Sequence, residues 1–238
     1  MSDLATLETA LRRDRNLAAL ADSHVHRATR EDSLGIIKGR DAITAAWVNE
    51  DASDLTIAAD LSDMIAYKVK SWHGHRWVWR EAGRILREVV VDDRGPDRNG
   101  PKTAPPAHPP LGELRSGEGQ YAASNTAILP PGFPEEARDI ANRLHQAWNG
   151  RAFNLYDRTW LPSLIRQLPD ATFHFEHAIV GDRQTAILWR VMGHHAGGQR
   201  VRLIGSSVFT GDADDTVIDH AAMAAQLVRP LIDYGRSA

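Results

Sequence analysis

The chain of 238 residues contains no cysteine. Disulfide bonds, thiolate nucleophiles and cysteine-ligated metals are therefore excluded. The chain also lacks an excess of positive charge, because its formal net charge is −3 and its pI is near 6.4. Nucleic-acid binding typically needs a basic face. We therefore expect no nucleic-acid partner.

Long apolar runs are absent as well. A helix needs about 18 or more consecutive apolar residues to span a bilayer, and no stretch approaches that length. The first sixteen residues carry charges throughout and have no apolar core of the kind found in secretory signals. We therefore expect no membrane partner and a cytoplasmic location.

Proline is unevenly distributed. Residues 94–134 hold most of the chain's twelve prolines, and no apolar periodicity survives in that stretch. A segment of this composition and length is more typical of a connector than of a folded element. The sequence thus predicts a first lobe at 1–93, a Pro/Gly-rich linker at 94–133 and a second lobe at 134–238.

Each lobe shows helical apolar spacing followed by runs rich in β-branched and aromatic residues. These runs are too closely spaced for parallel crossovers, so they predict antiparallel meanders and an α+β fold. In the first lobe we expect helices at 3–21 and 42–48, a loop over 21–33, and strands at 55–59, 64–72, 76–80 and 85–92. In the second we expect helices starting at Pro134, 153 and 161, strands at 172–180, 185–194, 199–210 and 216–218, and a final helix at 219–233.

Several short motifs resemble the SnoaL-like polyketide cyclase family of the NTF2-like superfamily. In the run AILWRVMGHHAG, Gly193 and His195 fall on the family's glycine and histidine, and Asp219, followed by Gln226-Leu227, falls on its aspartate. LPDATFHFEH, GIIKGRDAITAAW and WREAGRILREVVVDD resemble further family segments, with Asp92 or Asp93 at the last aspartate. The resemblance implies two tandem NTF2-like cone domains, each with N-terminal helices packed on a curved antiparallel sheet.

The resemblance also implies a chemistry. In these cyclases an aspartate and a histidine transfer protons during an intramolecular aldol closure, without a metal or an organic cofactor. It thus implies Asp219 as the acid–base group and His195 as its partner, acting on a small apolar carbonyl compound in a cyclase or isomerase reaction. As residues that line the substrate site we expect Trp148, Tyr156, Trp160, His174, Glu176 and Trp189.

Other interpretations of the same residues stay open. Asp219 could only cap the final helix, and His195 could be a turn residue facing solvent. Alternation predicts His174 and Glu176 on one strand face, which could be an outward, solvated face, and His177 on the opposite face with the phenylalanines. Paired histidines could bind metal, but no spacing fixes a third ligand, so we expect no metal site.

The alternative function is a non-catalytic module that binds a small molecule or another protein. Leu188, which stands where the family often has an arginine, favours this alternative. Sheets of this superfamily commonly pair face to face, so we expect the two lobes to form an intramolecular pseudo-dimer, to which a further homodimer contact could be added.

Overall fold

A computed structural model describes residues 14, 16–32, 35–47, 55–61, 63–69, 74–92, 127–150, 152, 160–195, 199–211 and 213–219. The predicted strand ends at 70–72, the helix at 153–159, the final helix beyond Asp219 and most of the 94–133 linker lie outside the described residues. None of the described helices is both long and apolar enough to cross a membrane.

The described chain is α+β, as predicted. Before the linker it forms α2 (Leu17–Asp22), β1 (His24–Asp32), β2 (Gly35–Lys38), α3 (Arg40–Trp47), β3 (Leu55–Asp60), β4 (Met64–Val69), β5 (Gly74–Glu81) and β6 (Arg84–Asp92). After the linker it forms η1 (Glu135–Ala137), α4 (Arg138–Trp148), α5 (Trp160–Gln167), β7 (Thr172–Val180), β8 (Thr185–His194), β9 (Arg200–Thr210) and β10 (Ala213–Ile218).

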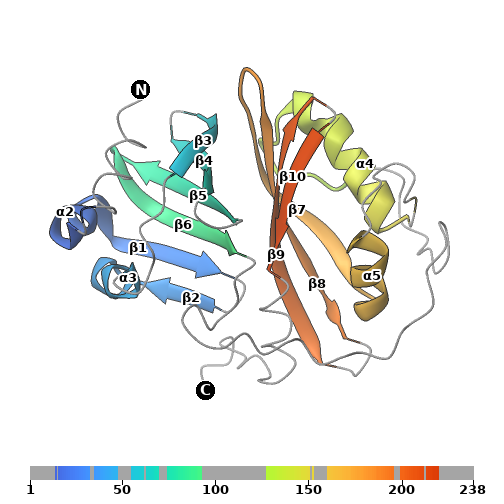
Figure 1. The fold of residues 1–238 in the computed structure, drawn as a ribbon, viewed down its shortest axis with the longest axis horizontal. Helices are drawn as coiled ribbons and strands as arrows, with labels where there is room; N and C mark the ends of the chain where they lie inside the picture. Colours follow the sequence, from blue (N-terminus) through green and yellow to red (C-terminus); the bar gives the residue numbers. More distant parts are fainter. Residues whose placement is uncertain are drawn as a thin grey trace.

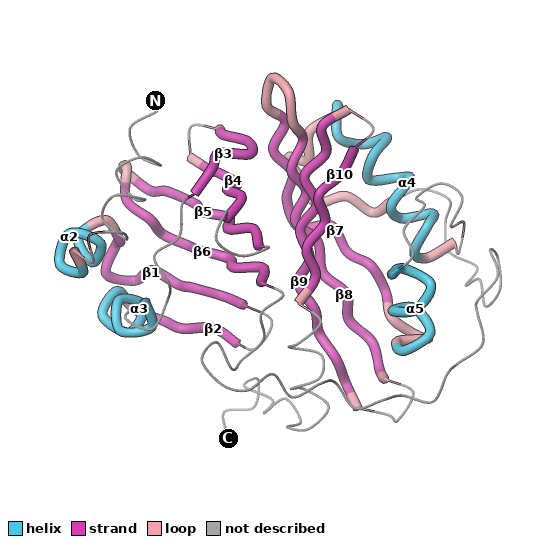
Figure 2. The backbone as a smooth tube through the Cα atoms, in the orientation of Figure 1, coloured by secondary structure: helices cyan, strands magenta, loops and turns pink. Residues whose placement is uncertain are grey.

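The elements stack in four layers, with α2 and α3 on one side, two sheets in the middle, and α4 and α5 on the other side (Figure 1). The first sheet has the order β2-β1-β6-β5-β4-β3 and the second the order β10-β9-β8-β7. Each sheet therefore draws its strands from one side of the linker only. The inner faces of the sheets meet, with β3 and β4 against β7, and β6 against β9 and β10 (Figure 2).

The first sheet contains a strand that the sequence did not predict. Residues 24–32 were expected in a loop, but they form β1, which pairs parallel to β6 and antiparallel to β2. The reason lies in its composition, HVHRATRED, in which three of the four buried side chains, His24, Arg30 and Glu31, are polar and only Ala28 is apolar. Polar residues of this kind give no alternating apolar signal.

The predicted helix over 3–21 is also corrected within the described part. Asn16 has a non-helical conformation, and its side chain accepts a hydrogen bond from the backbone N–H of Ala19 at 3.1 Å. Asn16 is therefore an N-cap, and α2 begins at Leu17.

Strand alternation divides the apolar side chains among distinct cores. The largest lies between the second sheet and the helices α4 and α5. A second fills the space between the two sheets and includes Trp77 and Leu188. Two smaller clusters lie on the outer face of the first sheet, one of them under α2 and α3. The side chain of Trp77 is fully buried in the core between the sheets.

Candidate functional site

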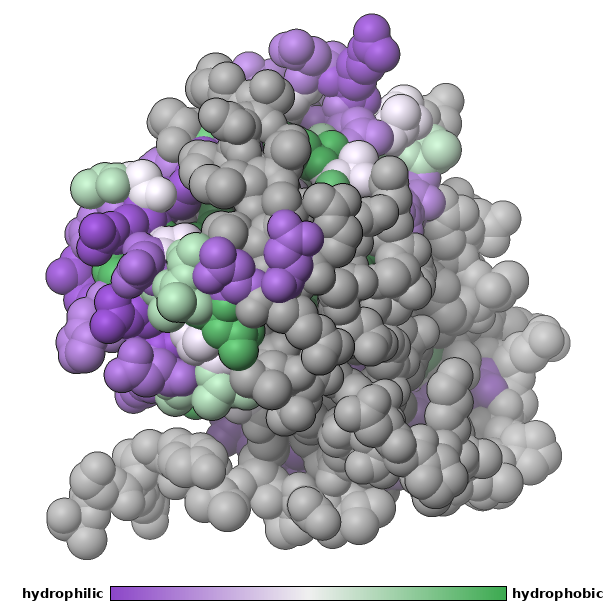
Figure 3. All heavy atoms as spheres, turned by 60° about the vertical axis from the view of Figure 1, so that its left-hand side comes forward, coloured by the Kyte–Doolittle hydropathy of each residue, from purple (hydrophilic) through white to green (hydrophobic). Residues whose placement is uncertain are grey.

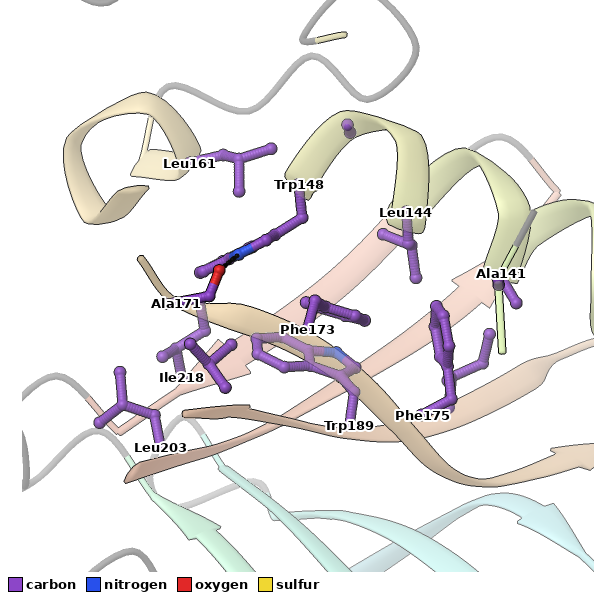
Figure 4. Close-up of a cluster of buried hydrophobic side chains, with 14 of the residues drawn as sticks. Ala141, Leu144, Trp148, Leu161, Ala171, Phe173, Phe175, Trp189, Leu203 and Ile218 are labelled. Carbon is purple, nitrogen blue, oxygen red and sulfur yellow. Dashed lines mark hydrogen bonds between the residues drawn. The ribbon is translucent and has the colours of Figure 1, made fainter. Parts of the chain in front are cut away.

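The face of the second sheet that α4 covers is lined by aromatic rings (Figure 4). The ring of Phe173 lies 4.7 Å from that of Trp189 and 5.5 Å from that of Trp148, measured between centroids. Trp148 comes from α4, where it ends the buried stripe, and its indole N–H donates to the carbonyl of Ala171 at 3.3 Å. The two tryptophans predicted to line a site thus lie on one face, packed close together.

Gly205 allows Trp189 to lie flat on the sheet. A Cβ at Gly205, the residue paired with Trp189 on β9, would stand 2.1 Å from the indole ring. No side chain can occupy that position while the ring keeps its place. The bare backbone at Gly205 therefore fixes the position of the indole and the direction of its N–H.

A chain of hydrogen bonds runs from this indole to a carboxylate. Trp189 Nε1 donates to the hydroxyl of Ser207 at 3.1 Å, and the hydroxyls of Ser207 and Thr216 are 2.8 Å apart. The Thr216 hydroxyl is also 2.7 Å from Oδ2 of Asp214. Thr216 has only one hydroxyl proton. When Asp214 is ionised, the Thr216 hydroxyl donates its hydrogen bond to that carboxylate, and the Ser207 hydroxyl donates to Thr216. Asp214 and Thr216 are half-buried, whereas Ser207 is fully buried.

The sequence-predicted pair Asp219 and His195 is not brought together. The backbone N–H of His195 bonds to the carbonyl of Gln199, at the β8–β9 hairpin end. Ile218, which precedes Asp219, pairs with Gly205. Gln199 directly precedes β9 and is six residues before Gly205. The two places where His195 and Ile218 are bonded are therefore about 20 Å apart along the extended chain. A direct or single-water hydrogen bond between the two side chains does not fit this register, although Asp219 is buried and His195 half-buried.

The remaining predicted site residues fall in different places. His174 is exposed and its Nε2 lies 2.7 Å from the Thr172 hydroxyl. Trp160 is the first residue of α5, and its side chain, like Tyr156, lies outside the described residues. Glu176 lies between the two sheets. Their roles in binding stay predictions.

Glu176 belongs to a network of charged groups that joins the two sheets. At its centre the Arg190 guanidinium donates to both oxygens of Glu31, at 2.8 and 2.9 Å, and through Nε to Glu176 at 2.6 Å. Arg87 bonds to Glu31 at 3.1 Å and also to Glu176, and Arg202 lies 3.3 Å from Glu31. Two carboxylates and three guanidinium groups are thus interleaved across the interface.

The network holds its groups in their charged forms. Burial alone raises the pKa of Glu31, but hydrogen bonds and positive charge from Arg190, Arg87 and Arg202 outweigh it, so the net pKa is lowered. The pKa of Glu176 is lowered for the same reason, with Arg190 and Arg87 opposing burial. Glu176 is therefore a weaker base than an ordinary glutamate.

His177 does not join the phenylalanines. A register shift between Phe175 and His177 forms a bulge, and the His177 ring lies 5.0 Å from that of Trp79 on the first sheet. Glu176 and His177 consequently both face the first sheet. The simple alternation used in the prediction fails because a bulge inserts one residue. Burial lowers the pKa of His177, with the charge of Glu176 opposing it.

A second polar group between the sheets contains a serine, a histidine and an aspartate. His75 Nδ1 is 2.9 Å from the Ser206 hydroxyl, and His75 Nε2 is 3.6 Å from Asp215. These are the residue types of a nucleophilic triad. Ser206 is, however, fully buried and its oxygen accepts the indole N–H of Trp77 at 2.9 Å. A substrate cannot reach it, so we assign this group to holding the sheets together.

One histidine of the second sheet is held by a carboxylate at the surface. His194 donates its backbone N–H to Asp170 at 2.6 Å, and its Nδ1 is 2.8 Å from the other oxygen of Asp170. Sequence reasoning selected the neighbouring His195 instead. The run LPD before β7 contained the signal, but the partner becomes visible only once β7 and β8 are paired.

The series of hydrogen bonds that ends at Asp214 was not predicted, for a similar reason. The sequence GDADDTVID indicated only a shorter strand than the family's. That Asp214 and Thr216 share a face with Ser207 follows from the β9–β10 register. Metal chemistry finds no support in the described part of the chain, where no three His, Asp or Glu side chains lie close enough to hold an ion.

Comparison with known proteins adds little. No protein-family model and no curated protein sequence matches the chain. A solved structure from Sphaerobacter thermophilus matches 37% of this chain and 91% of its own, with 16% identity and a TM-score of 0.32. A candidate polyketide cyclase from Acidithiobacillus ferrooxidans matches 43% of this chain and 73% of its own, with 16% identity and a TM-score of 0.26. These TM-scores are too low to establish a shared fold.

Proposed function

We propose that the chain is a cofactor-independent acid–base enzyme acting on a small apolar carbonyl compound, in a cyclase- or isomerase-like reaction. The observation that carries the proposal is the hydrogen-bonded chain from Trp189 to Asp214 on an otherwise aromatic face. Buried polar groups are costly in apolar surroundings. A carboxylate beside such a surface can accept a proton from the carbon next to a carbonyl, while neighbouring donors orient the substrate.

This proposal moves the acid–base group from Asp219 to Asp214. Asp214 lies on the helix-covered face because its partner Thr216 bonds to Ser207, which bonds to Trp189. The aromatic rings of Phe173 and Trp148 extend the same face. The rings of Trp148, Trp189 and Phe173 are themselves buried, so a substrate would meet the half-buried Asp214 and Thr216 at the edge of this apolar core. Such surroundings favour a small apolar compound.

Exchange of α-protons tests the reaction without knowledge of the natural substrate. The protein is incubated in D2O with 1-indanone or 2-tetralone, and loss of the α-proton signal is followed by NMR against a protein-free control. We expect exchange above that background, abolished by Asp214→Asn and retained in Asp182→Asn, a matched change at an exposed turn. Thr216→Val should reduce it, because the carboxylate then loses its donor.

Two other outcomes of this experiment would contradict the proposal. Exchange that survives Asp214→Asn but not Asp219→Asn or His195→Gln would return the site to the sequence-predicted residues. Absence of exchange above background with either ketone would overturn the enzyme proposal and leave the non-catalytic binding module.

We further propose that the chain is a two-lobed pseudo-dimer with the boundaries predicted from sequence, 1–93, 94–133 and 134–238. In support, each sheet takes its strands from one side of the linker, and the sheets meet through apolar and charged contacts. Limited proteolysis within the linker should yield two fragments that elute together in size-exclusion chromatography. Fragments that separate under native conditions would contradict the proposal.

A further inference from the structure

His194 and Asp170 form a surface pair that the proposed carbonyl site does not use. His194 ends β8, whereas the chain from Trp189 to Asp214 ends near the opposite end of the sheet, where Asp214 pairs with Phe209 and Phe209 with Thr185. From Thr185 to His194 the strand rises about 30 Å. The two groups are therefore separate sites.

The pair is pre-oriented by contacts on both sides. Asp170 uses one oxygen for the backbone N–H of His194 and the other for its Nδ1, so backbone and imidazole are held by a single carboxylate. Next to both residues, a Cβ at Gly193 would stand 2.5 Å from the Cα of Ala171. This close approach, which only glycine permits, fixes the distance between the strand end and the turn that carries Asp170.

The geometry also assigns the tautomer. A carboxylate at 2.8 Å from Nδ1 accepts a proton from that nitrogen, so the lone pair of the neutral imidazole is on Nε2. The His194 side chain is 57% exposed, so Nε2 can meet a reagent. His174, also exposed, differs because its Nε2 is engaged by the Thr172 hydroxyl.

We propose that His194 and Asp170 form a second, nucleophilic site that accepts acyl groups from activated esters of small carboxylic acids. Nε2 of His194 attacks the ester carbonyl, the C–O bond breaks, and the alkoxide leaves with the electron pair. Asp170 accepts the Nδ1 proton from the acylated ring. Water then attacks the acyl carbon and the C–N bond breaks, so that the hydroxyl group of the water remains in the released acid. The second proton of the water neutralises the alkoxide, and Asp170 returns its proton to Nδ1. Asp170 is a positioning residue in this scheme, because it acts through the imidazole.

Hydrolysis of p-nitrophenyl acetate by the full chain tests the site. We expect His194→Gln to remove most of the rate above buffer, whereas His26→Gln, at an exposed histidine of β1, leaves it unchanged. Asp170→Asn should lower kcat with little change in KM, because the carboxylate no longer orients the imidazole or accepts its Nδ1 proton.

A second measurement uses the unmodified protein. Diethyl pyrocarbonate, an activated acyl donor, should modify His194 faster than His26 and His174, as measured by peptide mass spectrometry. Equal labelling of the three histidines, or an unchanged kcat in Asp170→Asn, would overturn the proposal and leave Asp170 with a structural role in the turn.

Discussion

Replacement of Glu31 by glutamine should weaken the interface between the two sheets and lower the stability of the fold. The Glu31 side chain is only 8% exposed and accepts hydrogen bonds from Arg190 at 2.8 and 2.9 Å and from Arg87 at 3.1 Å. Glutamine has the same shape, but it is neutral and turns an amide N–H group toward guanidinium donors. Arg87 and Arg190 would then share Glu176, and Arg202 would lose the carboxylate of Glu31.

The size of the effect follows from burial. Removing one member of a buried ion pair costs about 3–5 kcal/mol. Here the arginine side chains keep 16 to 29% of their surface exposed and can turn partly toward water. We therefore expect a loss of about 2–4 kcal/mol in the free energy of unfolding. For a chain of this size, each kcal/mol lowers Tm by about 2–4 °C.

Urea and thermal unfolding, followed by tryptophan fluorescence and circular dichroism, measure this loss. Glu81→Gln is the matched control, because Glu81 pairs with Arg27 at the surface, with side chains 47 and 69% exposed. Exposed pairs contribute about 1 kcal/mol or less. If Glu31→Gln destabilises the protein no more than Glu81→Gln, the network does not hold the sheets together and the apolar contacts alone must do so.

Further predictions concern the same interface and the aromatic face. Because the pKa values of Glu31 and Glu176 are lowered in the folded state, their ionised forms stabilise the fold above the ordinary glutamate pKa. This stabilisation is lost as the pH falls through the folded-state pKa values. The Tm of a variant with glutamine at both positions should therefore fall less steeply in acid than the Tm of the parent. Gly205→Ala should cost about 3 kcal/mol and alter tryptophan fluorescence, because its Cβ would overlap the Trp189 ring; unchanged urea unfolding would contradict this. Ser206→Ala should cost about 1–3 kcal/mol in urea unfolding, since a buried indole N–H loses its acceptor, and a neutral result would show that the group is dispensable.

Aliphatic and aromatic strands were predictable from sequence. Residues 172–180 and 185–194 form β7 and β8 with the predicted bounds, because alternating or continuous apolar runs ended at clear turn signals. The strand β1 was missed because its buried residues are charged, and their partners are on other strands. Burial of Glu31 makes sense only beside Arg190, which is 159 residues away in the sequence.

The candidate site was less predictable for a related reason. Carboxylates and histidines near strand ends do find hydrogen-bond partners here, as Asp170 and His194 show. Their pairings depend on register and on the bulge at Glu176, neither of which the local sequence specifies. Thus His194 rather than its neighbour meets a carboxylate, and Asp214 joins a chain of hydroxyl groups on the aromatic face.

The parallel pairing of β1 with β6 has a consequence for the order of folding. Strands of the second sheet pair with their neighbours in sequence, so that sheet can form by successive hairpins. The first sheet closes only when Glu31 meets Val89, across a loop of about sixty residues, and such closure is slow. Since Glu31 is on this late-closing strand, its bonds to Arg190 form only after closure. In a chain whose first sheet has not closed, Arg190 and Arg202 of the second sheet lack the carboxylate of Glu31, so that end of the interface stays open to water until β1 is in place.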